Sequence, residues 1–245
     1  QGVKYAPAQG LPELLKQAAS GKFTLPGNVS SQFISGLLFA LPLLEGDSEI
    51  IITTPLESQS YVDLTLAALK KNTYKVVNNN YKIFSVPGGQ KYQCRNAVVE
   101  GDWSQAAFWL AAGCLNGNVI CAGAEPSSLQ GDRAVKDILQ AMGGKIAADG
   151  GLLAETSRLH GTVIDAADCP DIIPVLTVAA AVAEGTTEII NAGRLRIKEC
   201  DRLHAISEEL NKLGADIEEK AESLIVRGKP EGCAAELFLH GTTTA

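Results

Sequence analysis

The sequence has few of the residues that mark metal-binding and nucleic-acid-binding proteins. It contains only three histidines, and none of its six cysteines stands in a C-x-x-C pair, so a structural zinc site is not expected. The 21 Lys and Arg residues are outnumbered by 28 Asp and Glu residues, which leaves a net charge of −7. Because binding to a phosphate backbone requires clustered cations, this balance argues against a nucleic-acid partner.

Long hydrophobic runs are missing as well. The most apolar stretch, Ile172–Ala183, is far shorter than the roughly 20 residues that cross a bilayer, so no membrane partner is expected. Cys114 and Cys121 lie in apolar stretches, which is usual for reduced thiols and favours a cytoplasmic location. The chain opens at Gln1 with neither an initiator methionine nor a signal peptide, which is typical of a processed product or of a piece of a longer protein.

A repeated pattern runs through the 245 residues, of which 46% are hydrophobic and 20% charged, as in globular proteins. Three stretches are apolar on every side and predict buried helices: 30–44, 104–115 and 171–184. A short strand is predicted after each of them: 48–53, 118–122 and 187–191. Amphipathic helices then begin near Asp63, Asp132 and Asp201, at a constant spacing of 69 residues (132 − 63 and 201 − 132). Two strands close each unit: 74–77 with 82–86, 145–148 with 152–156, and 216–218 with 223–226.

The unit is therefore helix, strand, helix, strand, strand, with a further strand leading into the next buried helix, which places the chain in the α/β (α+β) class. A helix that is apolar on every side must be enclosed, so we expect sheets outside and these helices inside. The Pro, Gly and polar run at 86–93 predicts a domain boundary near 86–95. One short helical pattern, 11–19, precedes the first unit and resembles the end of an earlier one.

Hydroxyl side chains stand at the start of the first predicted buried helix, where Ser30, Ser31 and Gln32 follow a Gly-Asn turn. The free N–H groups and positive dipole end of a helix N-terminus can hold a phosphate, which two adjacent hydroxyls could wrap. The alternative is a plain N-cap, in which Ser30 satisfies the backbone and nothing is bound.

More hydroxyl groups follow the next predicted strand, in segment 57–61. Ser58 and Tyr61 could reach a ligand held by Ser31, since the strand ends and helix starts of one unit tend to lie on one rim. The alternative is a polar turn in which Ser60 caps the following helix.

A run of charges at 194–202 precedes the last amphipathic helix. Lys198 and Arg202 could bind anions there, while Glu199 could supply a carboxylate for acid/base chemistry. The alternative is a solvated run whose charges pair with one another.

Carboxylates are the more natural proton carriers in a chain with three histidines. Asp171, at the start of the third buried helix, could accept a proton from a hydroxyl substrate. Alternatively, it caps that helix, with Pro174 in the first turn. Asp102 could serve similarly, although capping of the second buried helix suits its position better.

Taken in order, six segments resemble the 3-phosphoshikimate 1-carboxyvinyltransferase family, also called 5-enolpyruvylshikimate-3-phosphate (EPSP) synthases. These segments are GNVSSQFISGLLFALPLL (27–44), ESQSYVDLTL (57–66), VEGDWSQAAFWLAA (99–112), LQGDRAVKDILQAMG (129–143), CPDIIPVLTVAAAVAEGTT (169–187) and NAGRLRIKECDRLHAISEELNKLGA (191–215).

The resemblance implies a fold of two similar domains, each with three βαβαββ-type units whose buried helices are enclosed by mixed sheets in an inside-out α/β barrel, and an active site in the cleft between them. Residues 1–90 would be the trailing part of the first domain, and residues 91–245 most of the second. The implied reaction transfers the enolpyruvyl group of phosphoenolpyruvate to the 5-hydroxyl of shikimate 3-phosphate through a tetrahedral intermediate, and releases phosphate. It uses no metal or organic cofactor.

The resemblance also implies roles for individual residues. Ser30, Ser31 and Ser58 look like binders of the phosphate of shikimate 3-phosphate, with Tyr61 as a further substrate-binding residue and Lys198 as another contact. Gln32 is similar to a residue that touches both substrates, and Arg202 to one that clamps phosphoenolpyruvate. Asp171 looks like the base at the 5-hydroxyl, and Glu199 like the acid that protonates the phosphoenolpyruvate methylene.

Some elements of the family have no counterpart in the chain: an early Lys-Ser segment, Asn-Ser-Gly-Thr, Arg-Pro, a late Asp-His-Arg and a C-terminal Lys. We therefore expect an internal portion of the enzyme, with the missing segments as a partner and the activity belonging to the complete protein. Two alternatives remain. One is the sister transferase acting on UDP-N-acetylglucosamine, which shares the fold but carries a reactive cysteine and other anion motifs. The other is a non-catalytic substrate-binding fragment.

Overall fold

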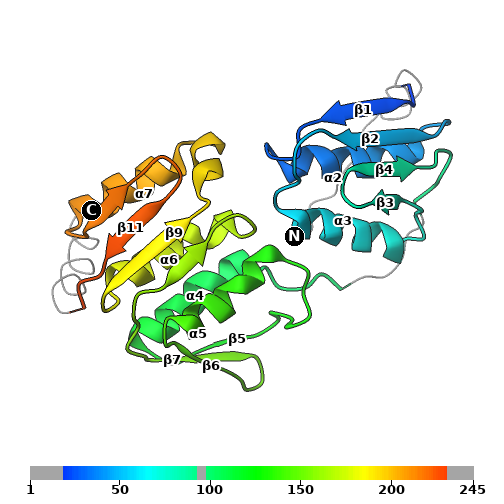
Figure 1. Ribbon diagram of the computed structural model, residues 1–245. Helices are drawn as coiled ribbons and strands as arrows, with labels where there is room; N and C mark the ends of the chain where they lie inside the picture. The colour runs from blue at the N-terminus through cyan, green and yellow to red at the C-terminus, as the bar shows by residue number, and fades with distance from the viewer. Residues whose placement is uncertain (1–18, 93–97, 231–245) are drawn as a thin grey trace, which may run out of the picture. The chain divides into compact units, whose positions relative to one another are not determined.

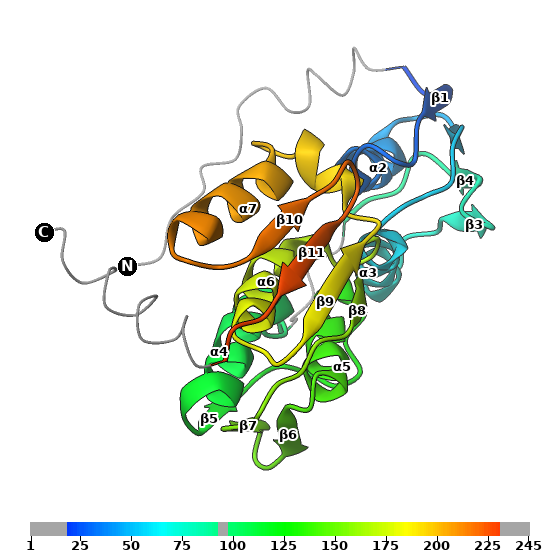
Figure 2. The ribbon, with the colours of Figure 1, turned by 60° about the vertical axis from the view of Figure 1, so that its left-hand side comes forward.

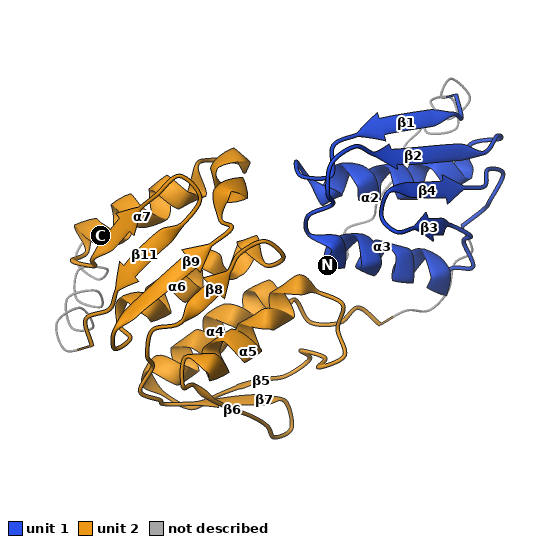
Figure 3. Cartoon of the chain, viewed as in Figure 1, with its two compact units in different colours: residues 1–97 blue, residues 98–245 orange. Residues whose placement is uncertain are grey.

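The computed structural model describes residues 19–92 and 98–230, and its chain divides into two compact units, residues 1–97 and 98–245 (Figures 1 and 3). Each unit has its own hydrophobic core. The predicted helix at 11–19 lies almost wholly outside the described residues. No helix of the described ranges is long and apolar enough to cross a membrane.

Unit 1 is a four-stranded sheet with two helices. Its elements are β1 (Lys22–Leu25), α2 (Ser31–Ala40), β2 (Ser48–Ile52), α3 (Gln59–Lys71), β3 (Val77–Asn79) and β4 (Ile83–Val86). The strand order is β1-β2-β4-β3, in which β1 runs parallel to β2 and the other pairs are antiparallel. Ile34 of α2, Val62 of α3 and Phe84 of β4 are fully buried together in its core, so helices and sheet share one apolar cluster.

Unit 2 holds two further sheets. Its helices are α4 (Trp103–Asn116), α5 (Ala134–Ala141), α6 (Ile173–Ala181) and α7 (Arg202–Lys212). Its strands are β5 (Val119–Cys121), β6 (Lys145–Ala148), β7 (Leu152–Glu155), β8 (Val163–Asp165), β9 (Thr186–Ile190), β10 (Ile217–Glu219) and β11 (Leu224–Arg227). The sheets have the orders β5-β7-β6 and β10-β11-β9-β8, and β8 runs parallel to β9 while the other pairs are antiparallel.

The predicted α/β class with mixed sheets is confirmed, and so is the placing of helices between sheets in unit 2. Helix α4 packs on the three-stranded sheet and on α6, and α6 packs on β11 of the other sheet (Figure 2). Seven of the nine residues of α6 are buried. The three sheets are open, and the described residues form no closed barrel.

Enclosure of the other two apolar helices was predicted and is wrong for the described residues. Phe33 on α2 and Trp109 on α4 are 63% and 62% exposed, and Phe39 and Phe108 are exposed beside them on the same helices. On each of these helices, the described residues leave part of the apolar surface uncovered.

Two aspartates cap helices as expected, whereas a third lies inside its helix. Asp102 caps α4 by accepting a hydrogen bond from the Ser104 amide at 2.8 Å, and Asp201 caps α7. The prediction that α3 starts near Asp63 is wrong, since α3 begins four residues earlier, at Gln59. The Asp63 carboxylate instead accepts a hydrogen bond from the Tyr81 hydroxyl at 2.8 Å.

Two further boundaries differ from the prediction. The strand expected at 74–77 lies at Val77–Asn79, because the Gln90 side-chain amide occupies both the N–H and the carbonyl of Lys75 and keeps that residue out of the ladder. Asp132 lies in a 3-10 turn, η2 (Gly131–Arg133), and α5 begins after it.

Gly113 of α4 marks a close approach of helix and sheet, since an added Cβ would lie 2.8 Å from the Ala154 Cβ and 2.9 Å from its carbonyl oxygen. We predict that Gly113→Ala lowers the free energy of unfolding by about 1–3 kcal/mol, because overpacking outweighs the better helix propensity of Ala. Gly36→Ala in α2, where nothing lies within 4 Å, should raise it by up to about 1 kcal/mol. Urea unfolding of both variants, followed by circular dichroism, measures this. Equal effects would contradict it.

Candidate functional site

The candidate residues of unit 1 lie where its two parallel strands end. Since β1 and β2 are parallel, the loops that follow them leave the sheet at one edge, and α2 and α3 start there. The two loops are joined by hydrogen bonds from the Gly27 amide to Thr54 Oγ1 at 2.9 Å and from the Glu57 amide to the Gly27 carbonyl at 3.1 Å. Gly27 is required, because a Cβ there would lie 2.9 Å from the Pro55 carbonyl oxygen.

Ser30 adopts the N-cap role that was one of its two predicted roles. Its Oγ accepts a hydrogen bond from the Gln32 amide at 3.2 Å. Ser31 begins α2 and is only 8% exposed, whereas the Gln32 side chain is exposed. The first turn of α2 thus combines a capping hydroxyl, a nearly buried hydroxyl and an amide side chain around the positive end of the helix dipole.

Ser58 immediately precedes α3 and is held in an unusual backbone conformation. Its φ of 52° and ψ of 47° lie in the left-handed region, which costs a non-glycine residue about 1–2 kcal/mol. It is 2% exposed, its carbonyl accepts a hydrogen bond from the Tyr61 amide, and its side chain does not cap the helix. Ser60 was the predicted alternative cap, which is wrong, because it lies inside α3 and its hydroxyl is buried.

Unit 2 repeats this geometry around its own parallel pair, β8 and β9. The six-residue separation between the end of β1 at Leu25 and Ser31 recurs between the end of β8 at Asp165 and Asp171. Asp171 lies in a 3-10 turn, η3 (Pro170–Ile172), and caps no helix. The segment 198–202 follows β9 and η4 (Gly193–Ile197), as segment 57–61 follows β2.

Four of the predicted residues form one charged cluster in unit 2. The Arg202 Nη1 lies 2.7 Å from the Asp171 Oδ1, and the Arg202 Nη2 lies 2.6 Å from the Glu199 Oε1. The Lys198 Nζ lies 3.7 Å from the same oxygen of Asp171. Asp171 thus faces two cations, and Arg202 faces two carboxylates. The cluster is half-buried, with the Arg202 side chain 23% exposed and that of Glu199 66% exposed.

Electrostatics hold two members of this cluster in their charged forms. Its own backbone amide and then the Arg202 guanidinium lower the pKa of Glu199, so this carboxyl is ionised at neutral pH. Partial burial opposes the charge of Arg202, but hydrogen bonds to Glu199 and Asp171 outweigh it and raise the pKa of Arg202. The pairing predicted as the alternative for the charge run is therefore present, and it joins the carboxylates predicted to carry protons to the cations predicted to bind anions.

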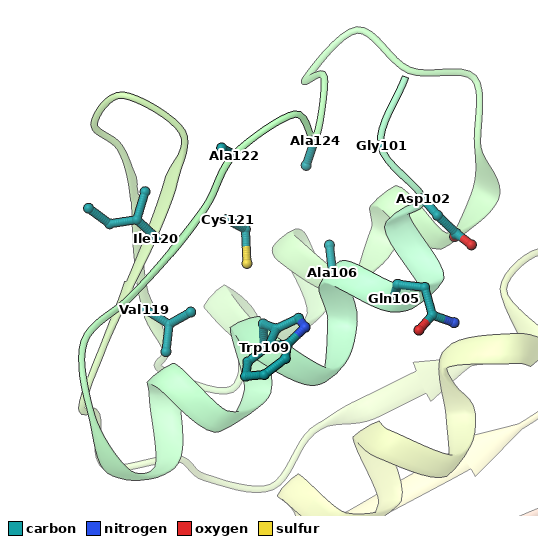
Figure 4. Close-up of a pocket in the computed structure, with 10 residues that line it drawn as sticks. All are labelled: Gly101, Asp102, Gln105, Ala106, Trp109, Val119, Ile120, Cys121, Ala122 and Ala124. Atoms are coloured by element: carbon teal, nitrogen blue, oxygen red, sulfur yellow. The ribbon is translucent and has the colours of Figure 1, made fainter. Parts of the chain in front are cut away.

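A cavity of about 380 Å³ lies elsewhere in unit 2, between α4 and segment 119–124 (Figure 4). Ala106, Trp109 and Cys121 contribute to its lining, which includes none of the predicted substrate-binding or catalytic residues. The carboxylate of Asp102, at its rim, is engaged as the cap of α4. This cavity is therefore separate from the charged cluster.

The buried thiols of unit 2 have no chemical role in these clusters. Burial raises the pKa of Cys114 to about 11, and burial followed by neighbouring aspartates raises that of Cys169 to about 12. Both thiols are protonated at neutral pH and are poor nucleophiles. Among the described residues, no group of three or more His, Cys, Asp or Glu side chains could hold a metal ion.

Sequence reasoning missed some of the residues that hold loops and turns in place. Thr54, which joins the two loops of unit 1, carries no sequence signal, whereas Gly27 stood in the predicted Gly-Asn turn. Gln130 was also missed. Its amide binds the Glu100 carboxylate at 3.0 Å and the Gly101 carbonyl, and thereby fixes the turn before α4.

In sequence comparisons, the family model and the curated relatives carry the same family name. The family model of EPSP synthase (3-phosphoshikimate 1-carboxyvinyltransferase) matches residues 2–237. The 3-phosphoshikimate 1-carboxyvinyltransferase of Clostridium beijerinckii is 53% identical over 235 residues, which cover 94% of this chain and 54% of the relative. That of Clostridioides difficile is 52% identical over 234 residues, which cover 93% of this chain and 53% of the relative. The chain thus spans about half the length of the curated relatives it matches.

Solved structures agree. EPSP synthase from Acinetobacter baumannii superposes with a TM-score of 0.68 at 27% identity, covering 86% of this chain and 49% of that one. The enolpyruvyl transferase NikO from Streptomyces tendae, at 16% identity, has a TM-score of 0.60, covers 86% of this chain and 52% of that one, and shows the fold alone.

Replacement of Arg202 should be visible in the titration of its neighbour. Because the lowered pKa of Glu199 depends partly on this guanidinium, Arg202→Met should move that pKa upward toward its ordinary value. The stabilisation from the pair is present above the unfolded-state pKa of Glu and disappears as the pH falls through the lower folded-state pKa. Carbon-13 NMR of the Glu199 carboxyl measures the titration. Arg158→Met, which removes an exposed pair with Glu184, is the control and should leave Glu199 unchanged.

Proposed function

Because this chain belongs to the EPSP synthase (3-phosphoshikimate 1-carboxyvinyltransferase) family, we propose that it serves the transfer of the enolpyruvyl group from phosphoenolpyruvate to the 5-hydroxyl of shikimate 3-phosphate. The relatives contain segments beyond those matched by this chain, so the proposal assigns turnover to an enzyme that includes such segments. Within that enzyme, residues 1–90 would belong to the first enolpyruvyl transferase domain and residues 91–245 to the second, at a cytoplasmic location.

The observation that carries the proposal is the charged cluster around Asp171. Both substrates are anions that carry phosphate, and Lys198 and Arg202 supply a point charge and a planar fork for such groups. In unit 1, Ser30, Ser31 and Ser58 would hold the phosphate of shikimate 3-phosphate at the start of α2 and α3, with Tyr61 and Gln32 as further substrate contacts.

The carboxylates would move the protons. In the addition step, Asp171 takes the proton of the 5-hydroxyl while the oxygen of this hydroxyl bonds to C2 of phosphoenolpyruvate. Glu199 delivers a proton to C3, which becomes a methyl group. In the elimination step, C3 would return a proton to the Glu199 carboxylate, the C2=C3 double bond would form as the bond from C2 to the phosphate oxygen breaks, and the departing phosphate would take the proton held by Asp171. An anion bound by Arg202 would draw the guanidinium away from Glu199 and raise the pKa of that carboxyl, which favours its proton uptake before addition.

A second candidate function is that of a substrate-binding fragment without turnover. The coverage of only about half of each relative favours it for the chain on its own. The two functions differ in turnover but share the same phosphate-binding residues.

Binding can be tested on the 245-residue chain by calorimetric titration with shikimate 3-phosphate. Ser31→Ala and Lys198→Ala should each weaken the affinity by about 10- to 100-fold, because each removes a hydrogen bond to a charged group. Ser35→Ala, one turn further along α2, and Lys212→Ala, at the end of α7, are matched controls and should change it by less than about threefold. Equal affinity of the two test variants and wild type would contradict the phosphate-binding roles.

Catalysis can be tested in an enzyme completed with the family's remaining segments. Asp171→Asn and Glu199→Gln should each lower kcat by about 10²- to 10⁴-fold, since each removes a proton-transfer group of similar shape. Binding of shikimate 3-phosphate should survive in both variants. Glu209→Gln, on the exposed part of α7, is the control. Turnover of Asp171→Asn at the wild-type rate would refute its role as the base.

A further inference from the structure

A second charge network, centred on Arg196, lies directly before the segment that carries Lys198 and Glu199. The guanidinium uses all three of its nitrogens. The Nε donates to the Ala221 carbonyl at 2.8 Å and the Nη2 to the Lys220 carbonyl at 2.6 Å. The Nη1 lies 2.9 Å from the Asp201 Oδ2 and 2.7 Å from the Glu219 Oε1. The proposed mechanism gives Arg196 no task, although this is the most extensively bonded side chain around the site.

The two carbonyls belong to the turn between β10 and β11, which supports the 3-10 turn η4 that contains Arg196. The Ala192 amide, just before η4, donates to the Glu222 carbonyl of the same turn at 2.8 Å. Leu195 of η4 is fully buried in the core of unit 2. Backbone and guanidinium contacts thus attach η4 to the edge of the sheet from both ends.

Asp201 extends this attachment into helix α7. One of its carboxylate oxygens binds the Arg196 guanidinium, and the other accepts a hydrogen bond from the His204 amide at 3.0 Å as the cap of α7. The segment 198–200 therefore lies between Arg196 and Asp201, and these two residues bind each other. The side chain of Arg196 is only 28% exposed, so these interactions are partly shielded from water.

Glu219 connects Arg196 to helix α7. Its Oε1 binds Arg196, and its Oε2 lies 3.0 Å from the Nδ1 of His204 on the first turn of α7. The His204 and Arg196 hydrogen bonds lower the pKa of Glu219, and the Glu219 hydrogen bond raises that of His204. The start of α7 is thus tied to β10 as well as to η4.

We propose that Arg196 is a positioning residue, whose guanidinium fixes the backbone of residues 197–202 so that Lys198 and Arg202 face Asp171 and Glu199 pairs with Arg202. The geometry carries this claim within unit 2, while its consequence for catalysis rests on the proposed function. A planar five-donor fork is required, since one group reaches two carbonyls and two carboxylates at once. A lysine keeps the charge but cannot span these acceptors.

Arg227 provides a matched comparison in the same sheet. It also pairs with two carboxylates, at 3.2 Å to Asp216 and 2.6 Å to Glu218. Its side chain is more exposed, at 49%, and both partners belong to β10 or the residue just before it. Removal of Arg227 therefore costs a similar pair of ionic contacts without touching η4 or the cap of α7.

The structural part of the proposal is tested by amide hydrogen exchange, measured by NMR, on the 245-residue chain. In Arg196→Gln the His204 amide, which Asp201 caps, should exchange at least tenfold faster than in wild type. Arg196→Lys should lie between the two, and Arg227→Gln should match wild type. An unchanged His204 exchange rate in Arg196→Gln would overturn the proposal. General unfolding would also accelerate amides of β9 and α6, so those amides separate a local effect from a global one.

The catalytic part is tested in the completed enzyme by steady-state kinetics. Arg196→Gln should raise the KM for phosphoenolpyruvate at least tenfold, because ordering of the anion-binding Lys198 and Arg202 is lost. It should lower kcat less than Glu199→Gln does, because the Glu199 carboxyl is still present. Arg196→Lys should recover part of this loss, and Arg227→Gln should show none. Faster exchange of the His204 amide in Arg196→Gln, together with a wild-type KM, would overturn the positioning role. A wild-type enzyme without enolpyruvyl transfer would refute the proposed function and leave the exchange experiment to decide the role of Arg196.

Discussion

The pairing of two parallel strands is the constraint on which both candidate clusters depend. Parallel strands end at the same edge of a sheet, so the loops after them, and the helices that the loops begin, meet there. In unit 1 this brings Ser31 and Ser58 to one edge, and in unit 2 it brings Asp171 to the segment 198–202. The antiparallel strands that complete each sheet add area to the core but contribute no candidate residue.

Within unit 2, mutual neutralisation keeps the charges in place. A half-buried arginine or carboxylate alone would lose hydration without compensation, whereas each member of the cluster has an oppositely charged neighbour within 4 Å. In the proposed function, an incoming anion would replace these pairs, because Arg202 and Lys198 are attached to Asp171 only through flexible side chains. The Arg196 network differs, since it joins side chains to backbone carbonyls and so holds the chain itself in place.

The buried helices show how one sequence property leads to different environments. Helix α6 is covered on one side by α4 and on the other by β11, so most of its apolar residues are buried. Helices α2 and α4 have a similar composition, yet Phe33 on α2 and Trp109 on α4 remain exposed in the part of the chain that the structure describes. Exposed apolar surface on a helix favours association with another element. The chain also spans only about half of each matched relative.

Local sequence determined the repeat, the α/β class, most helices and strands, and the caps Asp102 and Asp201, because periodicity and capping depend on residues within one or two turns of each other. It also indicated the two sets of candidate residues. Tertiary structure decided the features that rest on distant partners: Gln90, from 15 residues away, displaced the predicted strand from Lys75. The Arg196 guanidinium binds carbonyls more than twenty residues further along the chain. No local pattern records such pairings, since they exist only once the sheet has brought the segments together.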